Sequence, residues 1–170
     1  MSPRVISDHS PTAATSRKMR AVRRRNTGPE MALRAELRRA GVRYRIHAGE
    51  LPGTPDILIP ASRIAIFVHG CFWHRHPECR RTTTPRTNTQ FWTDKFDSNV
   101  RRDSRNARAL RAAGWSVFIV WECKIEHDLI GVVRRIVRAA EQSRIARRTG
   151  KDLNLQKSAS FVTTFDHADG

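Results

Sequence analysis

The chain has 170 residues, enough for about one domain with a real hydrophobic core, and no apolar run approaches the ~18 residues that span a bilayer. Its three cysteines are odd in number, which argues against a disulfide framework, and because no apolar signal segment leads the chain we expect a soluble, cytoplasmic protein. The 32 Lys and Arg residues outnumber the 16 Asp and Glu residues, and the resulting net charge of +16 favours nucleic acid as the partner.

Six of the Lys and Arg residues are clustered in one short stretch near the beginning of the chain. Residues 1–14, with Ser, Pro, Thr and Ala, are expected to be disordered, and a basic arm follows over residues 15–26. Guanidinium groups fork onto phosphate oxygens, so such an arm can follow a DNA groove. A merely soluble, Arg-biased surface is the alternative, but its charge would be scattered and not clustered. The arm contains Arg17, Lys18, Arg20, Arg23, Arg24 and Arg25.

Helix and strand signals follow the arm in a clear order. Thr27 and Glu30 fit a capping box with Pro29 inside the first turn, and Gly41 is placed to end this first helix. Three short apolar segments then predict strands, over residues 42–46, 56–59 and 64–68. The last of them is continuously apolar, which is typical of a strand buried on both faces.

The second half of the chain continues the alternation. A second helix is predicted from about residue 89, a buried strand over 117–121 and an amphipathic helix over 129–140, whereas residues 144–170 form a polar tail. Strands that alternate with helices in this way predict an α/β fold, with a mixed central sheet flanked by helices, in one domain over residues 15–143.

A group of cysteine and histidine residues predicts a metal site. Cys71, His76 and Cys79 form a C-x4-H-x2-C pattern, and Cys123 is the only other cysteine. Three thiolates and one imidazole make a closed tetrahedral zinc site, which stabilises the fold and leaves no open position for catalysis. Ordinary reduced cysteines are the alternative. The spacing alone does not choose between His74 and His76 as the fourth ligand.

Acidic and imidazole side chains lie near the ends of two predicted strands. Asp56 begins one strand and the next ends at Val68 and His69, so in a paired sheet these residues would meet, and the carboxylate could hold Mg2+ beside a phosphate. Turn capping is the alternative for a lone Asp. His69 and His74 could take a proton from water, because a neutral imidazole accepts protons near physiological pH. Glu30 could reach a metal-bound water, although helix capping explains it equally well.

Three aromatic residues lie in polar surroundings. Phe72 and Trp73 sit among His and Arg residues, and Trp92 follows another polar stretch. Aromatic rings in basic loops suit base stacking or insertion between base pairs, which is least costly at a mismatch. Packing over the metal site or against a helix is their alternative role.

Several segments of the chain closely resemble the very short patch repair DNA mismatch endonucleases. The likeness runs from about residue 15 to 140, and the segment around Cys71 is highly specific. The matching segments are Thr15-Ser-Arg-Lys-Met-Arg20, Leu51-Pro-Gly-Thr-Pro-Asp56, Phe67-Val-His-Gly-Cys-Phe-Trp-His74, Arg86-Thr-Asn88, Phe91-Trp92 with Lys95, Asn99-Val-Arg-Arg-Asp103, Gly114-Trp115 and Val120-Trp-Glu-Cys123.

The resemblance implies a restriction-endonuclease-like core with a structural zinc, in an endonuclease domain that nicks duplex DNA beside a T:G mismatch with the help of Mg2+. Carried over by residue, it makes Asp56 the Mg2+ carboxylate and the backbone carbonyl of Val68 a second ligand. His74 becomes the general base for the attacking water, and His69 and Glu30 support the water and phosphate network.

The resemblance also assigns the remaining site residues. Zinc would be held by Cys71, His76, Cys79 and Cys123, which resolves the histidine ambiguity. Phe72, Trp73 and Trp92 correspond to residues that wedge into the duplex, and Arg17, Lys18 and Arg20 are expected to contact its backbone. The protein is then expected to act as a monomer associated with the nucleoid, with general mismatch-repair proteins as further partners on family grounds.

Two rival functions remain open. One is a restriction-type or less selective endonuclease on the same fold, and the other is a non-catalytic zinc module that only binds DNA. The histidines argue against the second, because a binding module has no use for a proton acceptor beside a carboxylate.

Overall fold

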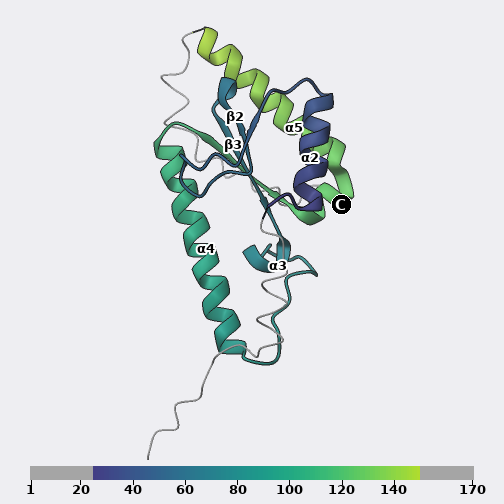
Figure 1. Ribbon diagram of the computed structural model, residues 1–170, viewed down its shortest axis with the longest axis vertical. Helices are drawn as coiled ribbons and strands as arrows, with labels where there is room; N and C mark the ends of the chain where they lie inside the picture. Colours follow the sequence, from purple (N-terminus) through teal and green to yellow (C-terminus); the bar gives the residue numbers. More distant parts are fainter. Residues whose placement is uncertain (1–24, 150–170) are drawn as a thin grey trace, which may run out of the picture.

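The computed structural model describes residues 25–149. The expected disordered segment 1–14, the arm residues Arg17, Lys18 and Arg20, and the end of the polar tail lie outside the described residues. The described chain forms a mixed sheet with helices on both faces (Figure 1). The α/β fold predicted from the sequence is therefore confirmed at this level.

The sheet has four strands in the order β1-β2-β3-β4. β2 pairs antiparallel with both β1 and β3, whereas β3 and β4 run parallel, with Val68 opposite Val120. A parallel pair needs a long crossover, and the helix α4 supplies it between β3 and β4. The strands are β1 (Arg45–Ile46), β2 (Ile57–Ile59), β3 (Ile64–His69) and β4 (Ser116–Trp121).

Two helical layers cover the sheet. α2 (Gly28–Arg39) and α5 (Glu122–Arg148) pack on one face, and α4 (Thr89–Ala112) packs on the other and extends well beyond it (Figure 1). Successive residues of β3 point to opposite faces, so Ile64 joins the core under α2 and α5 while Ala65 joins the core under α4. This explains the uninterrupted apolar run. No helix within residues 25–149 is long and apolar enough to cross a membrane.

The first helix begins and ends as its sequence predicts. The Thr27 side chain accepts a hydrogen bond from the Glu30 N–H, and Gly41 takes a left-handed φ of 75° after the helix. The Val42 N–H then bonds the Leu37 carbonyl, which closes the helix end. Because residue 42 serves this closure, the strand predicted over 42–46 was wrong in its start, and only Arg45–Ile46 pairs with β2.

The last helix is longer than predicted. α5 already starts at Glu122, directly after β4, and a break at Asp128 (φ −145°) separates this first part from the rest. The Asp128 carboxylate accepts a hydrogen bond from the Gly131 N–H at 2.8 Å, so it caps the segment that the sequence predicted from residue 129. The helix then continues past residue 143 to Arg148. Its last turns consist mostly of residues with high helix propensity, but they show little apolar periodicity.

Candidate active site and metal centre

A single helical turn follows β3 and was not predicted. Gly70 precedes α3 (Cys71–His74), and the Cys71 N–H donates to Oε1 of Glu122 at 2.9 Å, which ties the turn to the start of α5. The turn ends at Arg75, in a left-handed conformation with φ 56°. The four residues of α3 therefore serve two places in the structure. Cys71 lies in a cluster of cysteine and histidine side chains, and His74 lines a cavity next to it.

The four predicted zinc ligands come together around α3. The ligand atoms of Cys71, His76, Cys79 and Cys123 all lie within 4.8 Å of one another. His76 Nδ1 is 3.5 Å from the Cys71 sulfur and 3.3 Å from the Cys123 sulfur. The histidine in this cluster is His76 and not His74. All three cysteines are free thiols, so the group can hold a single metal ion.

Burial favours a metal ion in this cluster. Cys71 is fully buried, and burial, with the other cysteine thiols nearby, raises the pKa of its thiol. A buried thiolate is costly unless a cation balances its charge. The His76 ring stacks on Trp121 with centroids 4.3 Å apart, which fixes the imidazole plane. The residues present therefore fit a structural cation, and an ion would join two segments that are distant in the sequence, residues 71–79 and the start of α5 at Cys123.

A cavity of about 840 Å3 lies next to this cluster. Three parts of the fold line it: the start of α2 with Thr27 and Glu30, the strand ends with Asp56 and Val68, and one face of α4. His69, Trp73 and His74 line it as well. The sequence prediction that the strand ends meet at one point is confirmed, because the Val68 N–H donates to Asp56 Oδ2 at 2.8 Å.

Asp56 is suited to a cation. It is half-buried, and burial raises the pKa of its carboxyl to about 6, against the opposing hydrogen bond from Val68. Within residues 25–149, the Val68 N–H is the one hydrogen-bond donor to this carboxylate. Its second oxygen is thus available to a ligand in the cavity, and a bound cation would offset the burial that disfavours the charged carboxylate.

The two predicted histidines form a stacked pair with a carboxylate behind it. The rings of His69 and His74 lie 3.8 Å apart at 14°, and His74 Nδ1 is 2.5 Å from Asp103 Oδ2. Burial, with the neighbouring His74, lowers the pKa of His69 to about 3 and keeps this ring neutral. Burial opposes ionisation of Asp103, but the hydrogen bond and charge of His74 outweigh it, and the pKa of Asp103 is lowered.

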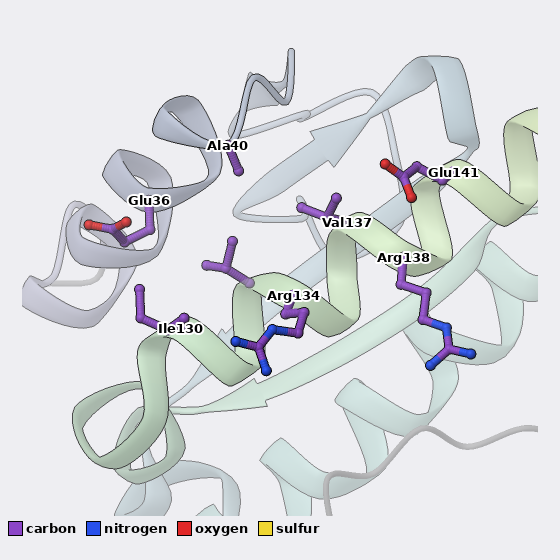
Figure 2. Close-up of a pocket in the computed structure, with 8 residues that line it drawn as sticks. Glu36, Ala40, Ile130, Arg134, Val137, Arg138 and Glu141 are labelled. Carbon is purple, nitrogen blue, oxygen red and sulfur yellow. The ribbon is translucent and has the colours of Figure 1, made fainter.

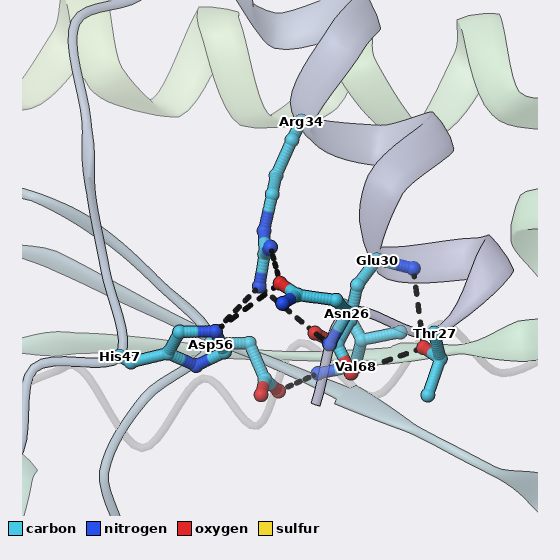
Figure 3. Close-up of polar contacts among 7 residues, drawn as sticks. All are labelled: Asn26, Thr27, Glu30, Arg34, His47, Asp56 and Val68. Carbon is cyan, nitrogen blue, oxygen red and sulfur yellow. Dashed lines mark hydrogen bonds and ion pairs between the residues drawn. The ribbon is translucent and has the colours of Figure 1, made fainter. Parts of the chain in front are cut away.

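Glu30 is held in place by several donors. Its Oε2 accepts hydrogen bonds from the Asn26 N–H at 2.9 Å and from Arg34 Nη2 at 2.8 Å, and its Oε1 accepts from the Thr27 hydroxyl at 3.0 Å (Figure 3). Glu30 therefore has the helix-capping role that the sequence offered as the alternative to a role at a metal-bound water. Glu30 also lines the cavity with Asp56.

The predicted stacking aromatics form one cluster. Phe72 makes edge-on contacts with Trp73, Trp92 and Phe96, at centroid distances of 5.1, 5.7 and 5.1 Å. Trp92 is only 7% exposed, so in this structure it has the packing role. Trp73 is half-buried, lines the cavity, and its carbonyl accepts a hydrogen bond from Asn99 Nδ2 at 3.0 Å.

A second hollow, of about 390 Å3, lies between α2 and α5 (Figure 2). None of the predicted site residues lines it, and it contains no histidine or cysteine. The catalytic residues expected from the sequence therefore line the cavity around Asp56 and not this hollow. The second hollow is lined by Glu36, Ala40, Ile130, Val133, Arg134, Val137, Arg138 and Glu141.

The sequence prediction missed the contribution of α4. Lys95, Asn99 and Asp103 line the cavity from positions four residues apart, so they share one face of the helix. The signal was present, because Asp103 lies seven residues from both Phe96 and Leu110 and therefore on the apolar face of the helix, where a charged residue is unexpected. Only the fold shows that this polar stripe borders the histidine pair.

Comparison with known proteins identifies the family. Residues 7–81 match the family model of DNA mismatch endonuclease Vsr. The chain is 41% identical to DNA mismatch endonuclease Vsr of Escherichia coli over 120 residues, which cover 71% of this chain and 76% of that protein.

Relatives described as nicking enzymes are also similar. The type II nicking enzyme V.XorIIP of Xanthomonas oryzae pv. oryzae is 47% identical over 107 residues, which cover 63% of this chain and 78% of that protein. The type II nicking enzyme V.NmeAIP of Neisseria meningitidis is 34% identical over 125 residues, which cover 74% and 89%. With these matches and the cavity that holds Asp56, His69 and His74, the chain belongs to the Vsr family of DNA mismatch endonucleases.

Proposed function

We propose that this enzyme nicks one strand of duplex DNA beside a T:G mismatch by Mg2+-dependent hydrolysis of a phosphodiester bond, and so initiates very short patch repair. The observation that carries the proposal is the cavity in which Asp56, from the sheet, and the His69, His74 and Asp103 group share one space. A carboxylate for a cation and an imidazole for a proton are the two groups that this hydrolysis needs.

Asp56 and the backbone carbonyl of Val68 would hold the Mg2+. When bound there, the ion would neutralise charge on the phosphate and on the leaving oxygen. The hard oxygen donors and the half-buried carboxylate suit this ion. Strand β3 ends in Val68 and His69 and carries no carboxylate, so proton transfer would fall to histidine.

His74 would accept the proton of the attacking water. Its Nδ1 is engaged by Asp103, so Nε2 is the nitrogen that can accept the proton, and the carboxylate stabilises the imidazolium that forms. His69 stays neutral because of burial and the adjacent His74, and it can hydrogen-bond water or phosphate without adding charge. Glu30, which lines the same cavity, would support this network.

The cysteine cluster would hold zinc. A tetrahedral ion with a Zn–S distance of ~2.3 Å and a Zn–N distance of ~2.0 Å places sulfur and nitrogen about 3.5 Å apart. The His76 nitrogen lies 3.5 Å from the Cys71 sulfur and 3.3 Å from the Cys123 sulfur. The ion would be structural, because all four positions are filled by protein.

DNA binding would use the arm and the aromatic cluster. Arg17, Lys18 and Arg20 would contact the backbone, and Phe72, Trp73 and Trp92 would wedge beside the mismatch, as the resemblance implies. To do so, Trp92 would have to leave the packed position that it has in this structure, where it is 7% exposed. The mixed sheet with helices on both faces suits a restriction-endonuclease-like core. A cytoplasmic monomer that associates with the nucleoid, with mismatch-repair proteins as further partners, completes the proposal.

The test is a comparison of substrates. The full-length protein is incubated with Mg2+ and a labelled duplex that contains one T:G mismatch, and in parallel with its fully paired counterpart. The proposal predicts one nick, in one strand, beside the mismatch, and little cleavage of the paired duplex. Equal cleavage of both duplexes would favour the restriction-type alternative, and binding without any strand break would favour a non-catalytic module.

A further inference from the structure

Arg34 on α2 is a buried cation beside the cavity that takes no part in the proposed hydrolysis. It is 8% exposed, and its Nη2 donates to Glu30 while its Nη1 donates to Asn26 Oδ1 at 2.6 Å. His47 Nε2 lies 3.5 Å from Nη2, and the buried Nε has no partner within residues 25–149. A buried ion pair of this kind adds little net stability over apolar packing, so its value lies in the geometry that it imposes.

The contacts of this cluster converge on Asn26. Its N–H donates to Glu30 at 2.9 Å, and its Oδ1 accepts from Arg34 and lies 3.4 Å from His47 Nε2 (Figure 3). Asn26 also adopts a left-handed backbone conformation with φ 54°, which Asn tolerates better than most residues. One residue is thus fixed by α2 and by the segment after β1 together.

Asn26 occupies a particular place in the chain. It is the last residue of the expected basic arm, and its neighbours Arg25 and Thr27 line the same cavity as Asp56. The arm therefore leaves the described part of the chain at the rim of the proposed catalytic cavity. The contacts that hold Asn26 therefore fix the position of the arm's C-terminal end relative to Asp56.

We propose that Arg34 is a positioning residue that, through Asn26, anchors the C-terminal end of the basic arm at the rim of the cavity. The arm and the catalytic groups then bind the same duplex in register. The inference rests on the proposed function, in which the arm contacts the DNA backbone. Arg34 itself is buried in its cluster and does not reach a phosphate, so its influence on DNA binding is indirect.

The salt dependence of DNA binding separates this role from a purely structural one. For B-DNA each phosphate contact contributes about 0.9 to the slope of log Kd against log salt concentration. We expect the full-length variant Arg17→Ala/Lys18→Ala/Arg20→Ala to lower the slope by about 2–3. Arg34→Met should lower it by about 2 and weaken binding about five- to tenfold at moderate salt, although it removes no phosphate contact of its own.

Two substitutions at Asn26 and one control sharpen the test. Asn26→Gly keeps the left-handed backbone but removes the side-chain acceptor, and it should reproduce the effect of Arg34→Met. Asn26→Asp keeps an acceptor for the guanidinium and should retain the wild-type slope. Arg39→Met removes an exposed charge from the same helix and should change the slope by no more than one contact, about 0.9.

Circular dichroism spectra test whether each variant is folded. If Arg34→Met is unfolded, the salt dependence of Asn26→Gly decides whether the Arg34–Asn26 contact positions the arm. Combining Arg34→Met with the triple arm variant should add no further loss, because both act through the arm. The inference would be overturned if Arg34→Met and Asn26→Gly both had the wild-type slope, or if the triple arm variant had it. Additive losses of slope in the combined variant would overturn it as well. If wild-type protein neither binds nor nicks the T:G duplex, it is the proposed function that fails.

Discussion

The carboxylate behind His74 offers the sharpest single perturbation of the proposed mechanism. Asp103→Asn preserves the shape of the side chain but removes the negative charge that faces His74 Nδ1 at 2.5 Å. The imidazole would then lose the group that stabilises its protonated form during the reaction. We expect slower nicking with little change in the fold, because neither the core nor the cysteine cluster contains Asp103.

The expected magnitude follows from the geometry of the pair. The bond is short, and the two side chains are 22% and 16% exposed, so solvent screens the interaction only in part. A hydrogen bond to a charged group is worth about 1.5–3 kcal/mol, and each 1.36 kcal/mol in the barrier changes the rate tenfold. Asp103→Asn should therefore lower the single-turnover rate about 10- to 150-fold.

The assay measures the single-turnover rate at saturating enzyme, with a T:G duplex and Mg2+, so that changes in DNA affinity do not contribute. Asp97→Asn is the matched control, since Asp97 lies on the same helix but is 56% exposed and pairs only loosely with Arg101 at 3.6 Å. It should retain the wild-type rate. A rate within twofold of wild type for folded Asp103→Asn, or an equal loss in the control, would refute the assigned role of the carboxylate.

Three further predictions concern the metal cluster, pH and the aromatic cluster. Wild-type protein should contain about one zinc ion per chain by elemental analysis. Cys71→Ala should abolish the cooperative thermal unfolding transition that circular dichroism detects in the wild type. A stably folded Cys71→Ala protein would contradict a structural ion. Burial raises the pKa of the Asp56 carboxyl to about 6, so the folded chain binds the carboxyl proton more tightly than the unfolded chain. The protonated carboxyl therefore contributes to stability below about pH 4, and this contribution is lost as the pH rises through 6. In urea denaturation without Mg2+, Asp56→Asn should be about 1–3 kcal/mol more stable than wild type at pH 8, and the difference should vanish at pH 4; a pH-independent difference would contradict the raised pKa. Trp92→Ala should destabilise the fold by about 3–5 kcal/mol, because the Trp92 side chain is 7% exposed. Trp73→Ala should cost less stability and should mainly reduce nicking at the mismatch. A larger loss of stability in Trp73→Ala than in Trp92→Ala would show that the burial of the two rings is misassigned.

Local rules predicted most of the elements from the sequence, and they failed where the chain serves a second purpose. The apolar segment before His69 could be recognised as a strand because it is buried on both faces. The start of β1 could not be located, because Val42 carries both an apolar side chain and the hydrogen bond that closes α2. A pattern of side chains does not reveal which backbone groups are already engaged.

The cysteine cluster shows what spacing can and cannot decide. The thiols and imidazoles near Cys71 predicted a metal site, but His74 and His76 were equivalent on spacing alone. The four-residue turn α3 separates them: it carries His74 to the stacked pair with His69, whereas His76 faces the sulfur atoms. One turn of helix is too short to leave a periodic signal in the sequence.

Asp103 and Arg34 could not be predicted for a different reason. Both are charged residues on amphipathic helices, where most charges simply face solvent. Asp103 becomes a site residue only because α4 packs beside α3, and Arg34 becomes buried only because the segment with His47 covers it. These are tertiary relations between elements that are distant in the sequence.

In the proposed mechanism, Asp56 and His74 act together in one cavity on a phosphodiester bond beside a T:G mismatch. The most direct measurement is the single-turnover nicking of a T:G duplex with Mg2+ by wild-type protein, Asp56→Ala and His74→Ala, each verified as folded. We expect one nick by the wild type and none by either variant. Full nicking by folded Asp56→Ala or His74→Ala would contradict this mechanism.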